Sequence, residues 1–182
     1  MPAATLTAEQ YDPSIEPLLS ATTNNSRSHE LETTSLHDIL RQRKLTALFQ
    51  PIIDLNSGEF FGYDGLIRGP ANCPRRSPVN LFSAALLQGL SLELEMLCQQ
   101  VVLETFARLN LPGNLFLNVS PEALTHPSFK NGQTLEFMTG LGILPERVII
   151  EITENQPTYD FVAMRSALLH YRSMGFKIAI DD

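Results

Sequence analysis

Short, nearly continuous apolar runs alternate with helical segments through most of this chain, and no other feature constrains the fold as strongly. Such runs are typical of parallel strands, because both faces of a parallel sheet are covered. The expected strands are residues 48–54, 59–68, 115–119, 147–152 and 176–181. The expected helices are residues 35–43, 79–87, 91–109, 133–141 and 159–174. Alternating helices and parallel strands indicate either an open doubly wound sheet or a closed barrel.

The first two strands differ from the others because only a tight turn separates them. Asn56-Ser57-Gly58 is a turn sequence, so the two strands are expected to pair as an antiparallel hairpin. No glycine-rich fingerprint follows any strand, which weighs against a dinucleotide-binding open sheet. A closed α/β barrel takes about 250 residues, whereas this chain has 182 and stops on a strand that ends at Asp181. The pattern therefore predicts a partial barrel, truncated after that strand.

The first 34 residues carry no sustained hydrophobic period. Prolines and the polar run at residues 22–28 indicate a flexible or disordered N-terminal tail over residues 1–34. The domain is expected over residues 35–182, and it begins with a helix for which Ser35 is the N-cap. The buried face of the longest helix is expected to consist of Leu94, Leu97, Cys98, Val101, Val102, Phe106 and Leu109.

The charge and the cysteines limit the class of protein. A formal net charge of −7 argues against a partner that is a nucleic-acid polymer, because no basic stripe is present to neutralise its phosphates. Cys73 and Cys98 lack a ligand-like spacing, so we expect two reduced thiols in a cytoplasmic protein. No run reaches the roughly 18 apolar residues that a membrane span needs, and the N-terminus does not resemble a signal peptide. A membrane-bound parent chain stays compatible with this sequence.

Polar residues stand within or at the end of four otherwise apolar strands: Asp64, Asn118, Glu151 and Asp181. A charged side chain in a buried strand is costly unless it is paired or binds a metal. The carboxyl ends of the strands form the active-site face of an α/β barrel. Three carboxylates and one amide form the all-oxygen ligand set that Mg²⁺, Mn²⁺ or Ca²⁺ prefers. Since such an ion polarises phosphoryl oxygens and activates water, the pattern predicts a metal site for phosphodiester chemistry.

Taken singly, these residues have ordinary explanations. An isolated Asp after a strand is commonly a helix cap or a turn former, and Asn118 could cap the turn into Ser120-Pro121. Glu151 is harder to explain in this way, because isoleucines flank it on both sides. The adjacent Asp181-Asp182 pair would repel unless a cation lies beside it. The combination favours the metal site.

Five motifs lie in order along residues 37–182. They are Phe49-Gln50-Pro51-Ile52, Gly62-Tyr63-Asp64-Gly65-Leu66-Ile67-Arg68, Leu117-Asn118-Val119-Ser120-Pro121, Ile150-Glu151-Ile152-Thr153-Glu154 and Ile178-Ala179-Ile180-Asp181-Asp182. In order and spacing the chain resembles the EAL-type cyclic-di-GMP phosphodiesterases of bacteria. The resemblance implies a TIM-like (β/α)8 barrel with one antiparallel strand, which agrees with the hairpin inferred above.

The resemblance also implies an activity, the hydrolysis of cyclic-di-GMP to the linear dinucleotide with Mg²⁺ or Mn²⁺. By position, the metal ligands would be Asp64, Asn118, Glu151 and Asp181. Asp182 would serve a second metal or the attacking water, and Glu154 would hold a loop linked to dimerisation and metal organisation. Arg68 would contact a ligand phosphate, whose geometry suits its bidentate fork. The guanine and ribose side would be lined by Gln50 and Leu66.

The chain departs from the family pattern in two respects. Its signature triplet is Asp64-Gly65-Leu66 in place of Glu-Ala-Leu. The shorter Asp retracts its oxygens by about 1.5 Å, which Mn²⁺ or Ca²⁺ should tolerate better than Mg²⁺, and Gly65 is expected to loosen the strand. The family's later catalytic lysine and glutamate lie beyond Asp182. We therefore expect this chain to be inactive alone, with open strand edges that favour aggregation or a homodimer.

Three functions follow from this pattern. The first is a cyclic-di-GMP phosphodiesterase, or the truncated front part of such a domain. The second is a catalytically impaired cyclic-di-GMP receptor, favoured by the altered Asp64-Gly65 pair, whereas the retained Asn118, Glu151 and Asp181 favour the enzyme. The third is a remnant with interaction roles only. In a longer parent chain, additional signalling domains are expected to accompany it.

Overall fold

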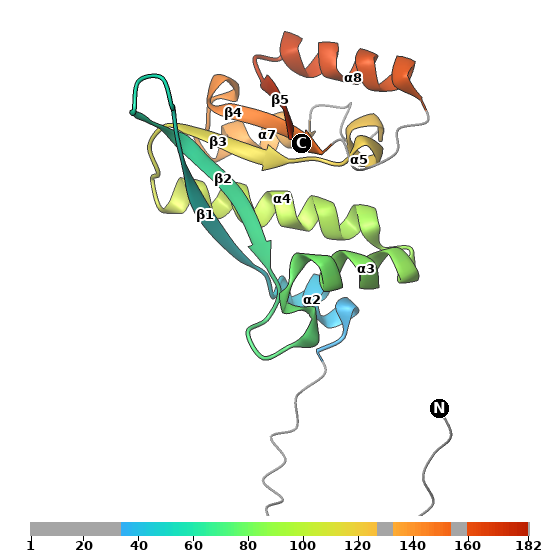
Figure 1. The fold of residues 1–182 in the computed structure, drawn as a ribbon. Coiled ribbons are helices and arrows are strands. Elements are labelled where there is room, and N and C mark those ends of the chain that lie inside the picture. Colours follow the sequence, from blue (N-terminus) through green and yellow to red (C-terminus); the bar gives the residue numbers. More distant parts are fainter. Residues whose placement is uncertain (1–33, 127–132, 154–159, 182) are drawn as a thin grey trace, which may run out of the picture. The chain divides into compact units, whose positions relative to one another are not determined.

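The computed structural model describes residues 34–126, 133–153 and 160–181. They contain a five-stranded sheet in the order β1-β2-β3-β4-β5 (Figure 1). The strands are β1 (Thr46–Ile53), β2 (Phe60–Arg68), β3 (Asn114–Asn118), β4 (Val148–Thr153) and β5 (Lys177–Asp181). β1 is antiparallel to β2, and every later neighbour is parallel. The predicted hairpin and the predicted parallel sheet are both confirmed.

The helices follow the sequence signals closely. They are α2 (Leu36–Gln42), α3 (Pro78–Gln88), α4 (Ser91–Arg108), α5 (Pro121–Thr125), α7 (Gln133–Gly140) and α8 (Phe161–Ser173), with 3-10 turns at Pro74–Arg76 and Pro145–Arg147. Ser35 caps α2 as predicted, because its hydroxyl accepts the backbone N–H of Asp38 at 3.1 Å. The five-residue α5 was not predicted. Its N-cap is Ser120, whose hydroxyl accepts the N–H of Ala123.

The side chain of Asp54 stabilises the hairpin turn by accepting backbone hydrogen bonds. Asp54 Oδ1 accepts the backbone N–H groups of Asn56 at 2.8 Å and Ser57 at 3.2 Å, an arrangement that favours a tight turn. Gly58 then takes a φ of 71°, in the left-handed region that glycine adopts without a steric penalty. The chain therefore reverses directly into β2, which explains the antiparallel start of the sheet.

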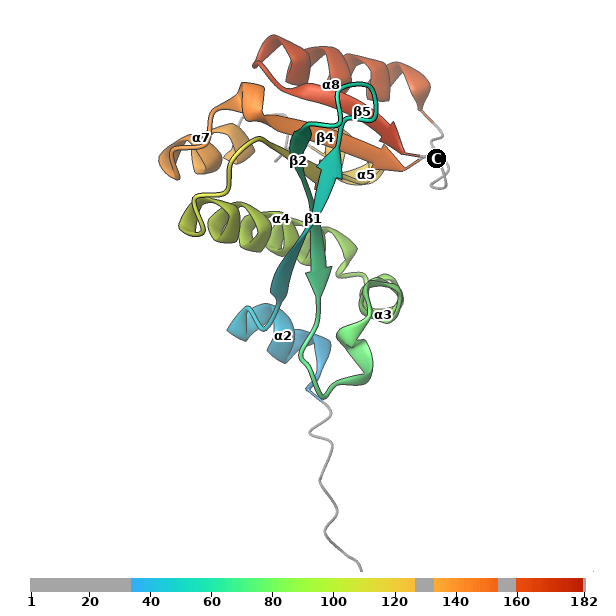
Figure 2. The ribbon, with the colours of Figure 1, turned by 60° about the vertical axis from the view of Figure 1, so that its left-hand side comes forward.

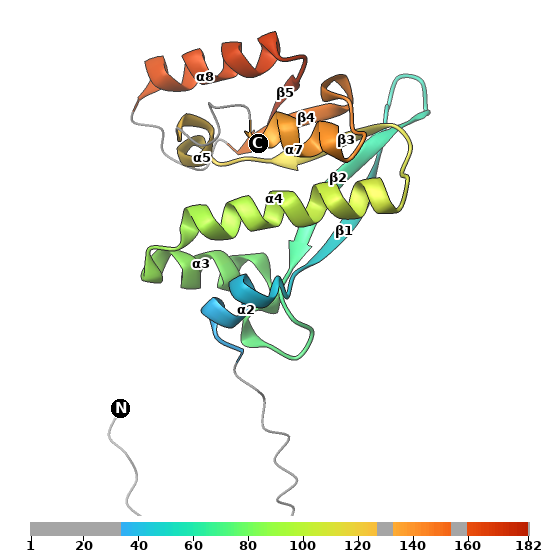
Figure 3. The same ribbon diagram turned by 180° about the vertical axis from the view of Figure 1, so that it is seen from behind.

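Helix α4 covers one face of the sheet, and α2 and α3 lie beside it on the far side from the sheet (Figures 1 and 3). The β1–β2 hairpin crosses α4 steeply, as Figure 2 shows. Helix α8 packs against β5 and α5. The three parallel pairings place the carboxyl ends of β2 to β5 at the same edge of the sheet, where α5 begins.

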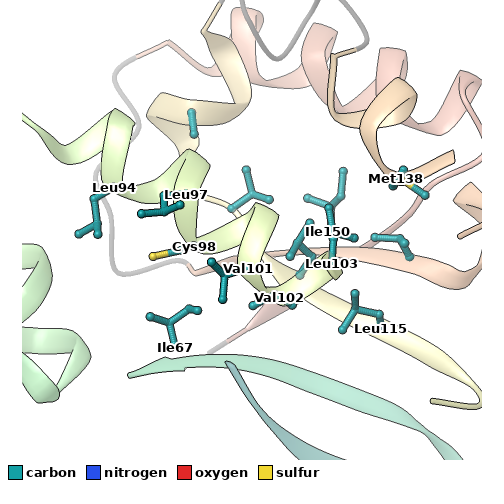
Figure 4. Packing of buried hydrophobic residues seen from close by; sticks show 14 of the residues in the cluster. Ile67, Leu94, Leu97, Cys98, Val101, Val102, Leu103, Leu115, Met138 and Ile150 are labelled. Atoms are coloured by element: carbon teal, nitrogen blue, oxygen red, sulfur yellow. The ribbon is translucent and has the colours of Figure 1, made fainter. Parts of the chain in front are cut away.

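The core lies between α4 and the sheet. Figure 4 shows Val101 and Val102 of α4 among Ile67, Leu115 and Ile150 of the strands (Figure 4). The predicted buried face of α4 is confirmed for Leu94, Leu97, Cys98, Val101, Val102 and Phe106. The prediction was wrong for Leu109, which is 48% exposed. The helix ends one residue earlier, at Arg108, and Asn110 turns the chain with a φ of 48°.

Both cysteines are free and buried. Burial, together with the nearby Glu95, raises the pKa of the Cys98 thiol to about 12, so this group is an unreactive core residue. Among the described residues, no helix combines the length and the apolar character that crossing a membrane requires.

Candidate metal and ligand site

Asp64, Asn118 and Glu151 are brought together on three adjacent strands. The Asn118 Nδ2 atom donates a hydrogen bond to Asp64 Oδ1 at 3.0 Å. Asn118 is also the Cα partner of Glu151 in the β3–β4 ladder. These two contacts place the three residues side by side in one row, which we call the site row.

The site row lies on the sheet face that points away from α4. Side chains alternate between the two faces of a strand, and Leu115, Leu117 and Ile150 are buried on the α4 side. The missing side chain of Gly65 would also point at α4, since a Cβ there would meet Val102. Asp64, Asn118 and Glu151 alternate with these residues and therefore project from the opposite face. Asn118 is exposed, and the two carboxylates are partly buried.

The residues predicted to bind the ligand continue this row across β1 and β2. Gln50 is the Cα partner of Asp64, and Leu66 is the partner of Leu48 in the same ladder. Arg68 is the last residue of β2, where its Nη1 donates to the carbonyl oxygen of Ile67 at 2.7 Å. Gln50 is exposed, whereas Leu66 and Arg68 are partly buried. The register thus places the Gln50 amide next to the site row, and Arg68 lies farther along the same strand as Asp64.

Three predicted residues cannot be placed in the same way. Asp181 is the last residue of β5 and the Cα partner of Thr153, which puts its backbone on the next strand beyond Glu151. The described structure does not extend to its side chain, and Glu154 and Asp182 lie outside the described residues altogether. Their predicted roles stay predictions.

The donors of the site row fit a hard divalent cation. Asp64 and Glu151 supply carboxylate oxygens and Asn118 an amide oxygen, which is the chemistry that Mg²⁺, Mn²⁺ and Ca²⁺ select. Within the part of the chain that the structure describes, no three Asp, Glu, His or Cys side chains gather into a metal cluster. A complete ligand set would therefore use the Asn118 amide together with a further carboxylate from β5.

Two glycines decide how closely β2 approaches its neighbours. A Cβ on Gly62 would lie 2.3 Å from the carbonyl oxygen of Asn114, inside the β3 backbone. A Cβ on Gly65 would lie 2.6 Å from Cγ1 of Val102 on α4. Both distances are shorter than real Cβ contacts, so β2 lies this close to β3 and α4 only because these side chains are absent. Gly65 therefore allows the strand to pack closely against α4. The sequence had predicted only that this glycine loosens the strand.

Sequence reasoning missed Glu95, which lies beneath the end of β3. Its carboxylate accepts the backbone N–H of Ser120 at 2.7 Å and the Ser120 hydroxyl at 2.6 Å. Burial raises the pKa of the Glu95 carboxyl, and the Ser120 hydrogen bonds oppose that rise. The available signal was an acidic residue between Leu94 and Cys98, on the apolar side of a helix.

Comparison with known proteins identifies the family of this chain. The model of the EAL domain family matches residues 33–182, and the chain belongs to this family. BlrP1 of Klebsiella pneumoniae, solved as a manganese and cyclic-di-GMP complex at pH 6, is 26% identical with a TM-score of 0.66. YkuI of Bacillus subtilis, solved with its substrate c-di-GMP and calcium, is 25% identical with a TM-score of 0.64. These matches confirm the family and its TIM-like fold.

The chain spans only part of each relative. The match covers 76% of this chain and 35% of BlrP1, and 81% of this chain and 38% of YkuI. An uncharacterized protein of Synechocystis sp. is 25% identical over 153 residues, which are 81% of this chain and 22% of that protein.

Proposed function

We propose that the site row is the metal-dependent cyclic-di-GMP site of a phosphodiesterase domain, which hydrolyses the cyclic dinucleotide to its linear form with Mg²⁺ or Mn²⁺. The observation that carries the proposal is the alignment of Asp64, Asn118 and Glu151, with 3.0 Å between Asn118 Nδ2 and Asp64 Oδ1. The complexes of BlrP1 with manganese and YkuI with calcium, both holding cyclic-di-GMP, support it.

The residues around the row have distinct tasks in this proposal. Asp64, Asn118, Glu151 and Asp181 would hold the cation. When bound, the cation supplies charge stabilisation at a phosphoryl oxygen and activates water. Arg68 would exchange its bond to the Ile67 carbonyl for a phosphate, for which its planar fork is suited. Gln50 and Leu66 would line the base and ribose, Asp182 would orient the attacking water, and Glu154 would hold the adjacent loop.

A second candidate is a cyclic-di-GMP receptor without turnover. The observation that favours it is Asp64-Gly65, where the family signature has Glu-Ala. Asp64 is one methylene shorter, so its oxygens withdraw by about 1.5 Å, and Mg²⁺ tolerates little change in distance. The retained Asn118 and Glu151 favour the enzyme, because a receptor that dispenses with the metal has no use for them.

Calorimetry of the chain with cyclic-di-GMP, with and without Mn²⁺, separates the two candidates. A phosphodiesterase site should bind the dinucleotide more tightly with Mn²⁺, and Glu151→Gln should abolish this gain. A receptor should bind equally well under both conditions and in the variant. Chromatography of the incubated nucleotide then tests for the linear product. If the wild-type chain binds neither Mn²⁺ nor the dinucleotide, the proposed site is wrong.

The surroundings of the domain are also proposed. A cytoplasmic location, a homodimer and accompanying signalling domains in a longer parent chain are consistent with the sequence. The tail predicted over residues 1–34 lies, up to residue 33, outside the described residues. Sedimentation of the purified chain tests the homodimer.

A further inference from the structure

A single carboxylate is buried beneath the site row. Glu95 of α4 is 8% exposed. It is the only acidic residue that is buried among the residues whose burial the structure describes. Burying a carboxylate is costly unless hydrogen bonds satisfy its oxygens. Glu95 therefore occupies a position where an apolar residue would be the simpler choice for the core.

Both oxygens of this carboxylate accept hydrogen bonds from Ser120. Glu95 Oε1 accepts the Ser120 backbone N–H at 2.7 Å, and Oε2 accepts the Ser120 hydroxyl at 2.6 Å. Gln99 makes a longer contact, with its Nε2 3.4 Å from Oε1. The Ser120 hydroxyl is also oriented by Ala123, whose N–H it accepts at 3.1 Å. Ser120 is thus fixed in both its backbone and its side chain.

Ser120 stands two residues after Asn118, and the residue between them is held as well. The Val119 N–H donates to the carbonyl oxygen of Glu151 at 2.9 Å, and Val119 is 5% exposed. The end of β3 is therefore fastened to β4 on one side and to α4 on the other. Figures 1 and 3 show α5, which begins directly after Ser120, beside α4 (Figures 1 and 3).

We propose that Glu95 is a positioning residue, which sets the Asn118 side chain for cation binding through its two-oxygen hold on Ser120. The inference rests on the proposed function for the role of Asn118. Glu95 itself lies on the α4 side of the sheet, opposite the site row, and acts only through Ser120. Removing its hold frees the turn that carries Asn118 and loosens the contact of the Asn118 amide with Asp64.

The test is Glu95→Gln in the 182-residue chain. Gln keeps one oxygen for the Ser120 N–H but replaces the other with an NH₂ group, which cannot accept the hydroxyl proton. Two quantities are measured: the NMR signals of the Asn118 side-chain amide in metal-free protein, and the affinity for Mn²⁺ alone. We expect the amide signals to move and the Mn²⁺ affinity to fall by up to about 10-fold, the lower end of the loss that follows removal of a direct hydrogen-bond partner of a metal ligand.

Ser120→Ala is the second variant, in case Glu95→Gln does not fold. It removes the hydroxyl but keeps the backbone N–H bond to Glu95, and it should change the same two quantities by a smaller factor. Its matched control is Ser77→Ala, which removes the N-cap hydroxyl of α3, a helix that carries none of the site-row residues. The control should lower the melting temperature but leave the Asn118 signals and the Mn²⁺ affinity unchanged.

The outcomes separate the two claims. Altered Asn118 signals with weakened Mn²⁺ binding, absent in Ser77→Ala, support the positioning role. Variants that lose stability yet keep the wild-type signals and affinity overturn it, because Glu95 would then serve only the fold. If the wild-type chain binds no Mn²⁺, the proposed function fails, and the amide signals alone decide whether Glu95 positions Asn118.

Discussion

Gly65 lies so close to Val102 that no side chain fits between them: a Cβ on Gly65 would lie 2.6 Å from Cγ1 of Val102. Val102 is branched at Cβ and is 2% exposed, so it has little freedom to move away. The glycine in the signature triplet is therefore matched to the valine of α4. The altered triplet is a packing feature of this chain as well as a change next to a metal ligand.

Replacing Gly65 with Ala should destabilise the protein by about 1–3 kcal/mol, the usual cost of overfilling a core. The double variant Gly65→Ala/Val102→Ala should recover part of that loss, with a coupling of about 0.5–3 kcal/mol. Urea denaturation measures both. Gly140→Ala is the matched control, because a Cβ there meets nothing within 4 Å. A Gly65→Ala variant as stable as the wild type would show that α4 can shift.

Asp64→Asn should weaken Mn²⁺ binding while leaving the fold intact. Asn has the shape of Asp, and its oxygen can still accept from the Asn118 amide, but it lacks the charge that attracts a cation. The loss of affinity should be at least the roughly 10-fold that follows loss of a ligand's hydrogen-bond partner. Calorimetry with Mn²⁺, Ca²⁺ and Mg²⁺ measures it, and Mg²⁺ should bind the wild type least well. Glu122→Gln, an exposed carboxylate of α5, serves as the control.

Stability should depend on pH through Glu95. Burial raises the pKa of this carboxyl above its ordinary value of 4.5, so the folded state binds its proton more tightly than the unfolded state. The resulting contribution to stability is fully present below pH 4.5 and is lost as the pH rises through the raised pKa. Relative to Glu95→Gln, which does not titrate, the wild type should therefore lose free energy of unfolding across that window. A difference in free energy of unfolding between the wild type and Glu95→Gln that is the same at every pH would contradict this.

Arg147 should be hard to replace with Lys. Its Nε donates to the Gly113 carbonyl at 2.9 Å, its Nη2 donates to the Leu111 carbonyl at 2.7 Å, and its guanidinium lies 5.2 Å from the centre of the Phe106 ring. Lys cannot make this forked contact. Arg147→Lys should cost about 1.5–3 kcal/mol, measured by thermal unfolding. Arg165→Lys, at an exposed position of α8, should cost almost nothing.

The site row could be predicted from the sequence because its members share a simple rule. Asp64, Asn118 and Glu151 each stand within or at the end of an otherwise apolar strand, and neighbouring parallel strands bring such positions together. The hairpin was equally accessible, since a turn sequence sits between two strands. These features depend on periodicity and on residues close in sequence, and both are visible in a single amino-acid sequence.

The contacts that hold the site row in place depend on residues far apart in the sequence. Glu95 and Ser120 are 25 positions apart, and helix α5 is too short to show a period. The match of Gly65 with Val102 joins a strand to a helix face whose register is fixed only by packing. Such pairings emerge from the tertiary structure, so the supports of the site row were missed while its members were found.

The direction of β1 decides where the polypeptide enters the domain. Because β1 is antiparallel to β2, its first residue, Thr46, is the partner of Arg68, the last residue of β2. Helix α2 leads into Thr46 after only a short link. A segment attached ahead of Ser35 is thus joined by one small helix to the rim that carries Arg68. Because Leu36 and Ile39 of this helix belong to the core, tension or rotation applied ahead of it would be felt by the core and by the end of β2 together.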